Sequence, residues 1–340
     1  MTLPVERSDK LRVVVTMDHA PGRIELLAPG GKPSWGRCRF EINPPWDTEA
    51  DYWIVYGNAR PFDRMRCAPV NTFFVAGEPL EKKLYPNRFY RQFRRIMDSH
   101  DRSRHPRLEI GSLGMCWHVG IGGNPRSFQF GYDYLNALQR PAKENRISVV
   151  CSNLTSTEGQ RRRLKFLSEL KLRFGDRIVH YGRGFQSIDD KMDAILPHRF
   201  HLVLENCESP NYWTEKLADA YLGWAFPLYV GCPNLEKYFS PDAFVRLNPR
   251  AIDQASEIIQ RLLNSSETEN ERQQVALARA AMLHTYNPFA CFSHWAETHH
   301  QNAAAEPVVV RSQKAFRSYG RGLLYRWRMR HWGPAAPIGG

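Results

Sequence analysis

Apolar residues in the second half of this chain gather into short runs, which lie at residues 147–151, 176–181 and 201–204. Helix-like stretches at 161–173 and 187–196 separate these runs. Short apolar strands that alternate with helices indicate parallel βαβ units. The pattern therefore predicts an α/β fold for this half of the chain.

The first half shows a looser version of the same order. Strand-like runs lie at 12–17, 51–56 and 71–76, and the basic, aromatic stretch 85–95 is predicted to be helical. The polar segment 264–271 is predicted to be an exposed loop before a helix at 272–284.

The strand pattern restarts near residue 145, after the charged stretch 141–146. A chain of 340 residues is long enough for two domains with separate cores. We therefore expect one domain at 1–145, a second at 146–300 and a basic, aromatic tail at 301–340.

The most informative segment runs from Phe200 to Phe244. It places a buried strand before the polar residues Glu205 and Asn206, and then a helix start with Glu215 and Lys216. In open α/β sheets, ligands bind beyond the carboxyl ends of the strands, where helix N-termini offer free N–H groups. A lysine there suits phosphate, and a carboxylate suits ribose hydroxyls. The alternative is a surface lysine beside a carboxylate that only complements the helix dipole.

The motifs F-x-L-x-x-E-N, Y-x-T-E-K-x-x-D-A and P-x-Y-x-G-x-P-N follow one another in this segment. In order and spacing they resemble the C-terminal signature of the α-1,3/4-fucosyltransferases, glycosyltransferase family 10. The resemblance extends back to Ser152 and Asn153 and to the Tyr-Gly-Arg-Gly run at 181–184. It covers most of residues 147–250, and the N-terminal half matches weakly.

This resemblance implies a GT-B architecture, with two Rossmann-like domains facing across a cleft and GDP-fucose held mainly by the C-terminal one. Carried over by position, Tyr212, Glu215 and Lys216 are similar to the donor-binding set of the family, and Asn206 to its cleft asparagine. The pyrophosphate arginine is best matched by Arg163. Its neighbours Arg161 and Arg162 leave that register open, because three arginines stand in a row.

Glu78 resembles the general base that the family uses against the acceptor hydroxyl. It lies in the segment Phe74–Pro79, which is similar to a short Gly-Glu segment of the family. Pro79 stands where the family usually has asparagine, so the match is short. The alternative is a structural carboxylate at the end of a strand.

Several further residues are candidates for the site. Trp117 and His118 lie in a glycine-rich loop and suit either an acceptor contact or a packed loop. Asp189 and Asp190 are adjacent and are typical of a solvated helix face. The chain has no D-x-D pair, so we expect no metal and no further cofactor. The histidines His180, His198 and His201 are expected to be satisfied core or surface residues.

Charge and cysteine content bear on the surroundings of the protein. The net charge is +12, and residues 311–340 hold seven basic residues and no acid, which leaves +5 for the rest. Arginines alternate with aromatics there, as in peripheral membrane segments, although a disordered solubilising tail is the alternative. Because the charge is confined to the tail, nucleic-acid binding is not expected.

The seven cysteines are scattered without a C-x-x-C pair, and no long apolar run occurs. These features predict a cytoplasmic protein without a zinc site, with a peripheral contact on the inner face of the membrane as an option. The resemblance then implies an inverting transferase that moves L-fucose from GDP-fucose to a glycan, such as a surface-polysaccharide or lipid-linked precursor. Two alternatives remain: the same fold with another nucleotide sugar, and a non-enzymatic protein that binds a membrane or an anionic polymer.

Overall fold

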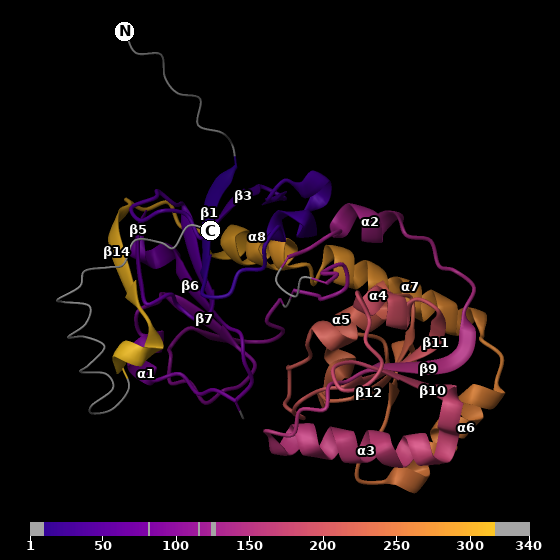
Figure 1. Ribbon diagram of the computed structural model, residues 1–340. Coiled ribbons are helices and arrows are strands. Elements are labelled where there is room, and N and C mark those ends of the chain that lie inside the picture. Colours follow the sequence, from indigo (N-terminus) through magenta and orange to yellow (C-terminus); the bar gives the residue numbers. More distant parts are fainter. Residues whose placement is uncertain (1–9, 81, 115, 124–126, 317–340) are drawn as a thin grey trace. The chain divides into compact units, whose positions relative to one another are not determined.

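The computed structural model describes residues 10–80, 82–114, 116–123 and 127–316 (Figure 1). The chain divides into two compact units, and each brings together segments that are distant in sequence. Within the described residues, the first unit comprises 10–20, 32–113 and 289–316, and the second comprises 21–31 and 114–288.

The first unit is built on a seven-stranded sheet with the order β2-β3-β1-β4-β6-β7-β8. Every neighbouring pair is parallel except β2 and β3. The strands are β1 (Leu11–Met17), β2 (Ser34–Trp35), β3 (Cys38–Ile42), β4 (Tyr52–Gly57), β6 (Thr72–Ala76), β7 (Arg95–Asp98) and β8 (Leu108–Ile110). The three strands predicted in this half, which correspond to β1, β4 and β6, are confirmed.

Aromatic side chains cover both faces of this sheet. On one face, the ring of Phe74 packs edge-on against Phe89, at 4.9 Å between centroids. On the other face, Phe73 stacks on Trp295 of α8 (Pro288–His299) at 5.4 Å. A small antiparallel sheet of β5 (Phe62–Cys67) and β14 (Glu306–Arg311) also belongs to this unit.

The helix predicted at 85–95 is largely wrong. Only α1 (Asn87–Tyr90) is helical, and β7 begins at Arg95. Phe89, Tyr90 and Phe93 are all buried against the sheet. A continued helix would turn part of this aromatic run toward solvent, so tertiary packing overrides the local preference.

The second unit contains a five-stranded parallel sheet with the order β10-β9-β11-β12-β13. Its strands are β9 (Glu144–Val150), β10 (Ile178–Tyr181), β11 (His198–Leu204), β12 (Phe226–Val230) and β13 (Val245–Arg246). Its helices are α2 (Tyr132–Ala137), α3 (Glu158–Phe174), α4 (Lys191–Ile195), α5 (Glu215–Leu222), α6 (Ile252–Asn264) and α7 (Glu269–His284). The parallel βαβ prediction is confirmed, although α4 is shorter than the helix expected at 187–196.

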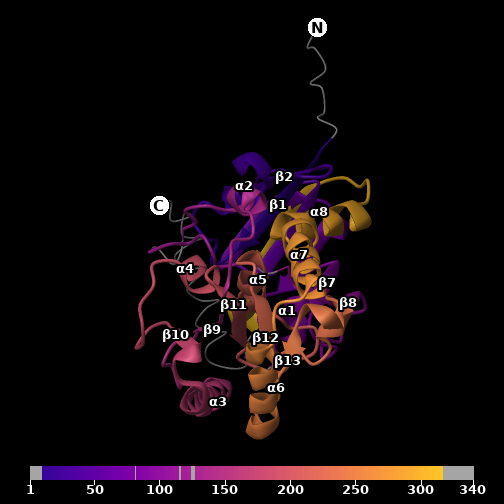
Figure 2. The same ribbon diagram turned by 90° about the vertical axis from the view of Figure 1, so that its right-hand side faces the viewer.

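Helices cover both faces of this sheet, with α3 and α6 on one side and α4 and α5 on the other (Figure 2). Alternate residues of β11 serve the two faces. Phe200 and Leu202 join the core beneath α3 and α6. His201 lies in a hollow with Ile195 of α4, where its ring bonds Ser148 at 2.8 Å.

The polar segment 264–271 is not a simple exposed loop. Helix α7 already begins at Glu269, with Thr268 as its N-cap. Glu271 is buried and accepts hydrogen bonds from Arg199 at 2.8 and 2.6 Å. A glutamate in a polar run is expected to be solvated, but the buried Arg199 of β11 gives Glu271 a buried ion-pair partner.

The compact units differ from the domains expected at 1–145, 146–300 and 301–340. Residues 114–145 belong with the second unit, where the carboxylates of Asp219 and Asp190 hold the loop at 118–122. Helix α8 and strand β14 return to the first unit, where β14 pairs with β5. The start of the expected tail is therefore part of a folded unit.

Residues 317–340, which carry most of the basic, aromatic tail, lie outside the described residues. Among the residues that the structure does describe, no helix combines the length and the hydropathy needed to cross a membrane.

Candidate functional site

The carboxyl end of β11 carries a buried carboxylate, Glu205. Its backbone N–H extends the parallel ladder by donating to the carbonyl of Val230, at 2.9 Å. Its side chain accepts two hydrogen bonds from Thr214, one from the backbone N–H at 2.9 Å and one from the hydroxyl at 2.7 Å. Glu205 thereby joins the end of a central strand to the start of α5.

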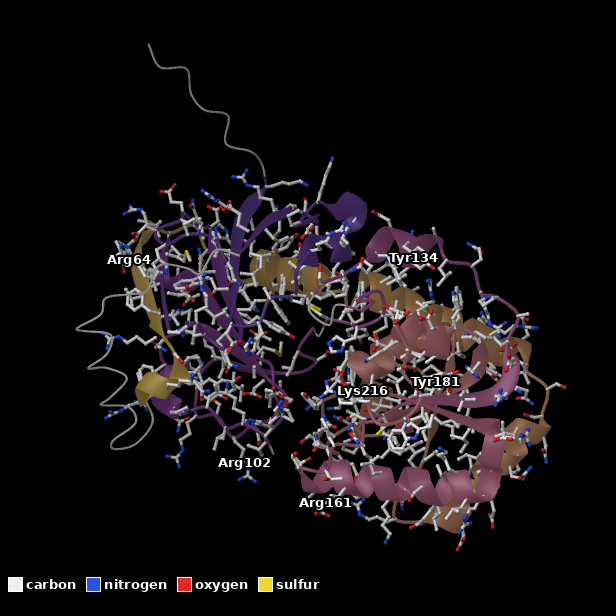
Figure 3. The ribbon with its side chains drawn as sticks, in the orientation of Figure 1. Arg64, Arg102, Tyr134, Arg161, Tyr181 and Lys216 are labelled. Carbon is white, nitrogen blue, oxygen red and sulfur yellow. The ribbon has the colours of Figure 1, made fainter. Side chains whose placement is uncertain are left out.

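Thr214 is the N-cap of α5, and its hydroxyl accepts from the backbone N–H of Lys216 at 3.4 Å. The ammonium of Lys216, in the first turn of this helix (Figure 3), lies between two carboxylates. Its Nζ donates to Glu215 at 2.9 Å and approaches Glu205 at 3.4 Å. Strand end, cap and helix start thus form one polar cluster.

Burial and charge compete in this cluster. Burial works against the charge of Lys216, but the carboxylates of Glu215 and Glu205 outweigh it and raise the pKa of the lysine. Burial also works against the charge of Glu215, and the neighbouring Lys216 reverses this and lowers its pKa. For Glu205, burial dominates and raises the pKa, because its side chain is fully enclosed. Lys216 therefore keeps its charge inside the unit.

Arg163 supplies a second cation near the same strand end, and this one is buried. Its Nη1 donates to Asn206 Oδ1 at 2.7 Å, and its Nη2 lies 3.5 Å from the hydroxyl of Ser152. Its Nε is buried without a hydrogen-bond partner. A side chain at Gly159 would come within 1.8 Å of the Asn206 carbonyl oxygen, so this glycine lets α3 approach the loop after β11.

Two small hollows connect these groups. One is lined by Arg163 and Glu205 together, and the other by Lys216, Lys191 and Asp219. We call this region of the second unit the strand-end cluster; it comprises Arg163 of α3, Glu205 and Asn206 after β11, and Thr214, Glu215, Lys216 and Asp219 at and within α5.

The three consecutive arginines have different surroundings. Arg161 is exposed at the start of α3 (Figure 3), where it bonds the Thr155 carbonyl and Glu158. Arg162 pairs with Glu208 at 3.2 Å. Of the three, Arg163 is the one that contacts Asn206, which favours the register chosen from the sequence.

Tyr212 is buried in the loop between β11 and α5. The residue before it, Asn211, has a left-handed backbone with φ of 59°. Its side-chain oxygen accepts from Asn234 at 2.9 Å and from the hydroxyl of Tyr238 at 3.0 Å. These bonds fix the loop that carries Tyr212.

Sequence reasoning missed a second pair of carboxylates, of which Asp219 is buried and Asp190 is partly exposed. Asp219 accepts hydrogen bonds from the backbone N–H groups of His118 and Val119 at 2.6 and 2.9 Å, and from Lys191 at 2.6 Å. Its place in the Y-x-T-E-K-x-x-D-A motif was the available signal. An aspartate three residues after a lysine does not by itself predict that it binds the backbone of His118 and Val119, about 100 residues earlier.

Asp190 corrects the expectation of a solvated aspartate pair at 189–190. It is the N-cap of α4, and its carboxylate accepts from the N–H groups of Gly120 and Gly122 at 2.9 and 2.7 Å. These donors come from a distant loop, so the adjacency of Asp189 and Asp190 could not predict that Asp190 is hydrogen-bonded.

The glycine-rich loop is a packed loop at Trp117, which is buried. The side chain of His118 is exposed, with its Nδ1 3.9 Å from the carboxylate of Glu215. The other histidines follow expectation: His180 bonds the Cys151 carbonyl at 2.8 Å, and His198 bonds the Ala194 carbonyl at 2.9 Å.

Glu78 belongs to the first unit, two residues beyond β6. Its side chain is partly exposed and forms an ion pair with Lys82 at 2.5 Å. The preceding residue packs closely, because a Cβ at Gly77 would meet the Cα of Gly57 at 2.8 Å. Glu78 is therefore a strand-end carboxylate on a tightly packed turn.

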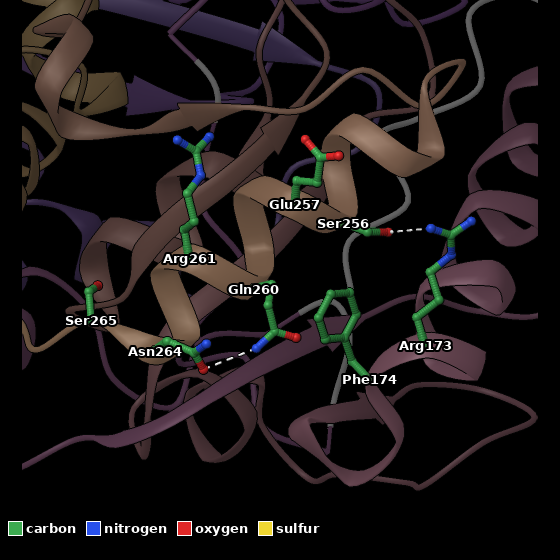
Figure 4. Close-up of a pocket in the computed structure, with 8 residues that line it drawn as sticks. All are labelled: Arg173, Phe174, Ser256, Glu257, Gln260, Arg261, Asn264 and Ser265. Carbon is green, nitrogen blue, oxygen red and sulfur yellow. Dashed lines mark hydrogen bonds between the residues drawn. The ribbon is translucent and has the colours of Figure 1, made fainter.

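A larger pocket, of about 890 Å³, lies between α3 and α6 in the second unit (Figure 4). Arg173 donates to Ser256 at 3.2 Å on one side of it, and Gln260 donates to Asn264 at 3.0 Å on the other. Its lining shares no residue with the strand-end cluster. In the described part of the chain, no group of three or more His, Cys, Asp or Glu side chains could hold a metal ion.

The region that contains this cluster matches a known family. Residues 140–273 match the model for the C-terminal part of glycosyltransferase family 10 (fucosyltransferase). We refer to residues 140–273 as the family 10 region. The family 10 region includes β9 to α6 and thus every residue of the strand-end cluster from Arg163 to Asp219.

Related proteins align with only part of the chain. An alpha-(1,3)-fucosyltransferase of Helicobacter pylori is 32% identical over 77 residues, which cover 22% of this chain and 16% of that protein. A 4-galactosyl-N-acetylglucosaminide 3-alpha-L-fucosyltransferase 9 of Mus musculus is 31% identical over 112 residues, 32% of this chain and 30% of the mouse protein. The chain therefore aligns with less than a third of the length of either relative.

Solved structures match over most of the chain. A crystal structure of an alpha1,3-fucosyltransferase has a TM-score of 0.51 at 18% identity and covers 89% of this chain and 92% of its own. The structure of an alpha1,3-fucosyltransferase with GDP has a TM-score of 0.50 at 16% identity and covers 89% and 94%. At these identities the likeness concerns the fold, which is GT-B with two Rossmann-like units.

Proposed function

We propose that this protein is an inverting fucosyltransferase that moves L-fucose from GDP-fucose to a hydroxyl of a glycan. The observation that carries the proposal is the strand-end cluster, where Lys216 of α5 and Arg163 of α3 lie in the family 10 region. Two cations near the carboxyl ends of parallel strands, the buried Arg163 and the partly exposed Lys216, suit a nucleoside diphosphate.

The residues of the cluster divide the donor between them. Lys216 and Arg163 meet the diphosphate, and the unpartnered Nε of Arg163 leaves a donor for a phosphate oxygen. Glu215 accepts hydrogen bonds from donor hydroxyls, since its carboxylate keeps its charge beside Lys216. Asn206 orients Arg163, and Tyr212 completes the donor contacts.

The transfer breaks the bond between the anomeric carbon and the phosphate oxygen, and GDP leaves with the bonding electrons. Lys216 and Arg163 stabilise the charge that develops on the departing diphosphate, so these residues need no metal to do so. The acceptor oxygen forms the new bond on the opposite face of the sugar. Its proton passes to a general base, and we assign that role to Glu78.

The domain roles are part of the proposal. The second unit, which contains the family 10 region, binds the donor, and the first unit provides the base and binds the acceptor. A surface polysaccharide or a lipid-linked precursor is the acceptor class that suits a basic, aromatic tail near a cytoplasmic membrane surface.

The first test is thermal unfolding with and without GDP, because a ligand that binds only the folded state raises its stability. GDP at about 100 times its Kd adds about 2.7 kcal/mol, and UDP and CMP serve as controls. No shift with any nucleotide would refute the donor site.

Donor hydrolysis with GDP-fucose, GDP-mannose, UDP-galactose and CMP-sialic acid then identifies the sugar. We expect release of GDP from GDP-fucose above that from the other donors. Turnover of a different nucleotide sugar would keep the transferase but reject fucose.

A further inference from the structure

The loop at 117–122 is held from two sides by carboxylates of its own unit, of which Asp219 is buried and Asp190 is partly exposed. Asp219 binds the backbone N–H groups of His118 and Val119, and Asp190 binds those of Gly120 and Gly122. These four backbone donors fix the path of the loop without using the side chain of His118. The imidazole is thus placed by the main chain and left available.

The fixed imidazole lies beside the donor cluster. Its Nδ1 is 3.9 Å from the Glu215 carboxylate, and 47% of the His118 side chain remains exposed. Glu215 in turn holds Lys216 at 2.9 Å. The distance between imidazole and carboxylate exceeds a hydrogen bond, but a hydroxyl can bind both groups at once, because it is a donor and an acceptor together.

The charge state of the ring suits such a partner. Burial of its surroundings and the nearby cations Lys191 and Lys216 lower the pKa of His118, against the opposing effect of Glu215 and Asp219. A neutral imidazole carries one N–H donor and one acceptor nitrogen, which match a hydroxyl better than a phosphate.

We infer that His118 and Glu215 together bind a hydroxyl of the nucleotide sugar, so that His118 is a donor-specificity residue from outside the family 10 region. This inference rests on the proposed function. The hydroxyl belongs either to the ribose or to the hexose, and the two cases give different binding patterns.

The test compares His118→Ala, His118→Phe and His118→Gln by calorimetry with GDP and with GDP-fucose. We expect His118→Ala and His118→Phe to weaken GDP-fucose binding about tenfold, and His118→Gln to recover most of the loss, because an amide keeps a donor and an acceptor. Equal losses with GDP and GDP-fucose assign the contact to ribose. A loss with GDP-fucose alone assigns it to the hexose.

His294→Ala serves as the matched control, because His294 is an exposed histidine on α8. If the wild-type protein binds both ligands and all three His118 variants bind them equally well, the inference is wrong while the proposed function stands. If the wild-type protein binds neither ligand, both are wrong.

Discussion

Two strand ends in this protein carry a glutamate, and they are built in opposite ways. Beyond β11, Glu205 is fully enclosed, accepts two bonds from Thr214 and faces Lys216. Beyond β6, Glu78 is partly exposed and its ion-pair partner is the exposed Lys82. A glutamate that follows a parallel strand is thus enclosed by several hydrogen-bond partners in one case and has a single exposed ion-pair partner in the other.

The difference indicates which carboxylate is suited to a structural role and which to a proton-transfer role. A buried, multiply bonded carboxylate is fixed in one state and position, which suits a frame for a charged ligand. A carboxylate with one flexible partner can exchange that partner for a substrate hydroxyl and accept its proton. The comparison therefore favours a structural role for Glu205, and it leaves Glu78 with the freedom that the proposed base needs.

The largest expected effect comes from Glu78→Gln. Removing the base without changing the shape of the side chain should cut turnover about 10²-fold, and GDP affinity should not change. Steady-state transfer and calorimetry measure the two quantities, with Glu306→Gln as the exposed control on β14. Near-normal turnover would return Glu78 to a structural role.

Lys216→Ala should weaken GDP binding by about 2 kcal/mol, or about 30-fold, because a charged hydrogen bond to phosphate is lost. Titration of GDP gives the affinity. Lys237→Ala, an exposed lysine of the same unit, should bind GDP like the wild type. Unchanged affinity in Lys216→Ala would remove this lysine from the donor site.

Arg163→Ala should lose about tenfold in GDP affinity, whereas Arg161→Ala should change it less than about twofold. The contrast follows from their surroundings, since Arg163 is buried against Asn206 and Arg161 bonds local groups at the surface. A larger loss of GDP affinity in Arg161→Ala than in Arg163→Ala would mean that Arg161, and not the buried Arg163, binds the phosphate.

The smallest effect concerns the pH dependence of stability. In Lys216→Ala, Glu205 loses its nearest cation, so its already raised pKa rises further. A carboxyl group with a raised pKa in the folded state loses stability as pH rises through that pKa. Urea unfolding should show a stability gap from the wild type that is about 1 kcal/mol larger at pH 8 than at pH 5. A gap independent of pH would exclude Glu205 as its source.

The sequence predicted the core of the strand-end cluster better than the residues that support it. Asn206, Glu215 and Lys216 lie within a few residues of one strand and one helix start, so local pattern places them together. Asp219 and Asp190 hold a loop that lies 68 or more residues earlier in the chain, and no local sequence pattern predicts such a distant contact.

Single-helix periodicity also could not choose among the three arginines, because burial of Arg163 depends on Gly159 letting α3 approach the loop after β11. The prediction of a helix at 85–95 was wrong for a related reason. Its side chains surround Phe74, and that contact exists only once the sheet has formed. Glu78 was found by resemblance, and its surroundings do not test its role.

The return of α8 and β14 to the first unit determines which piece of this chain is transplantable. A cut at residue 145 would leave the loop at 117–122 without Asp190 and Asp219. A cut at 288 would strip α8 from the first sheet and uncover Phe73. To move the second unit intact into another protein, residues 114–288 would have to be inserted with both ends joined to the receiving chain. The segment 21–31 would have to be transferred with them.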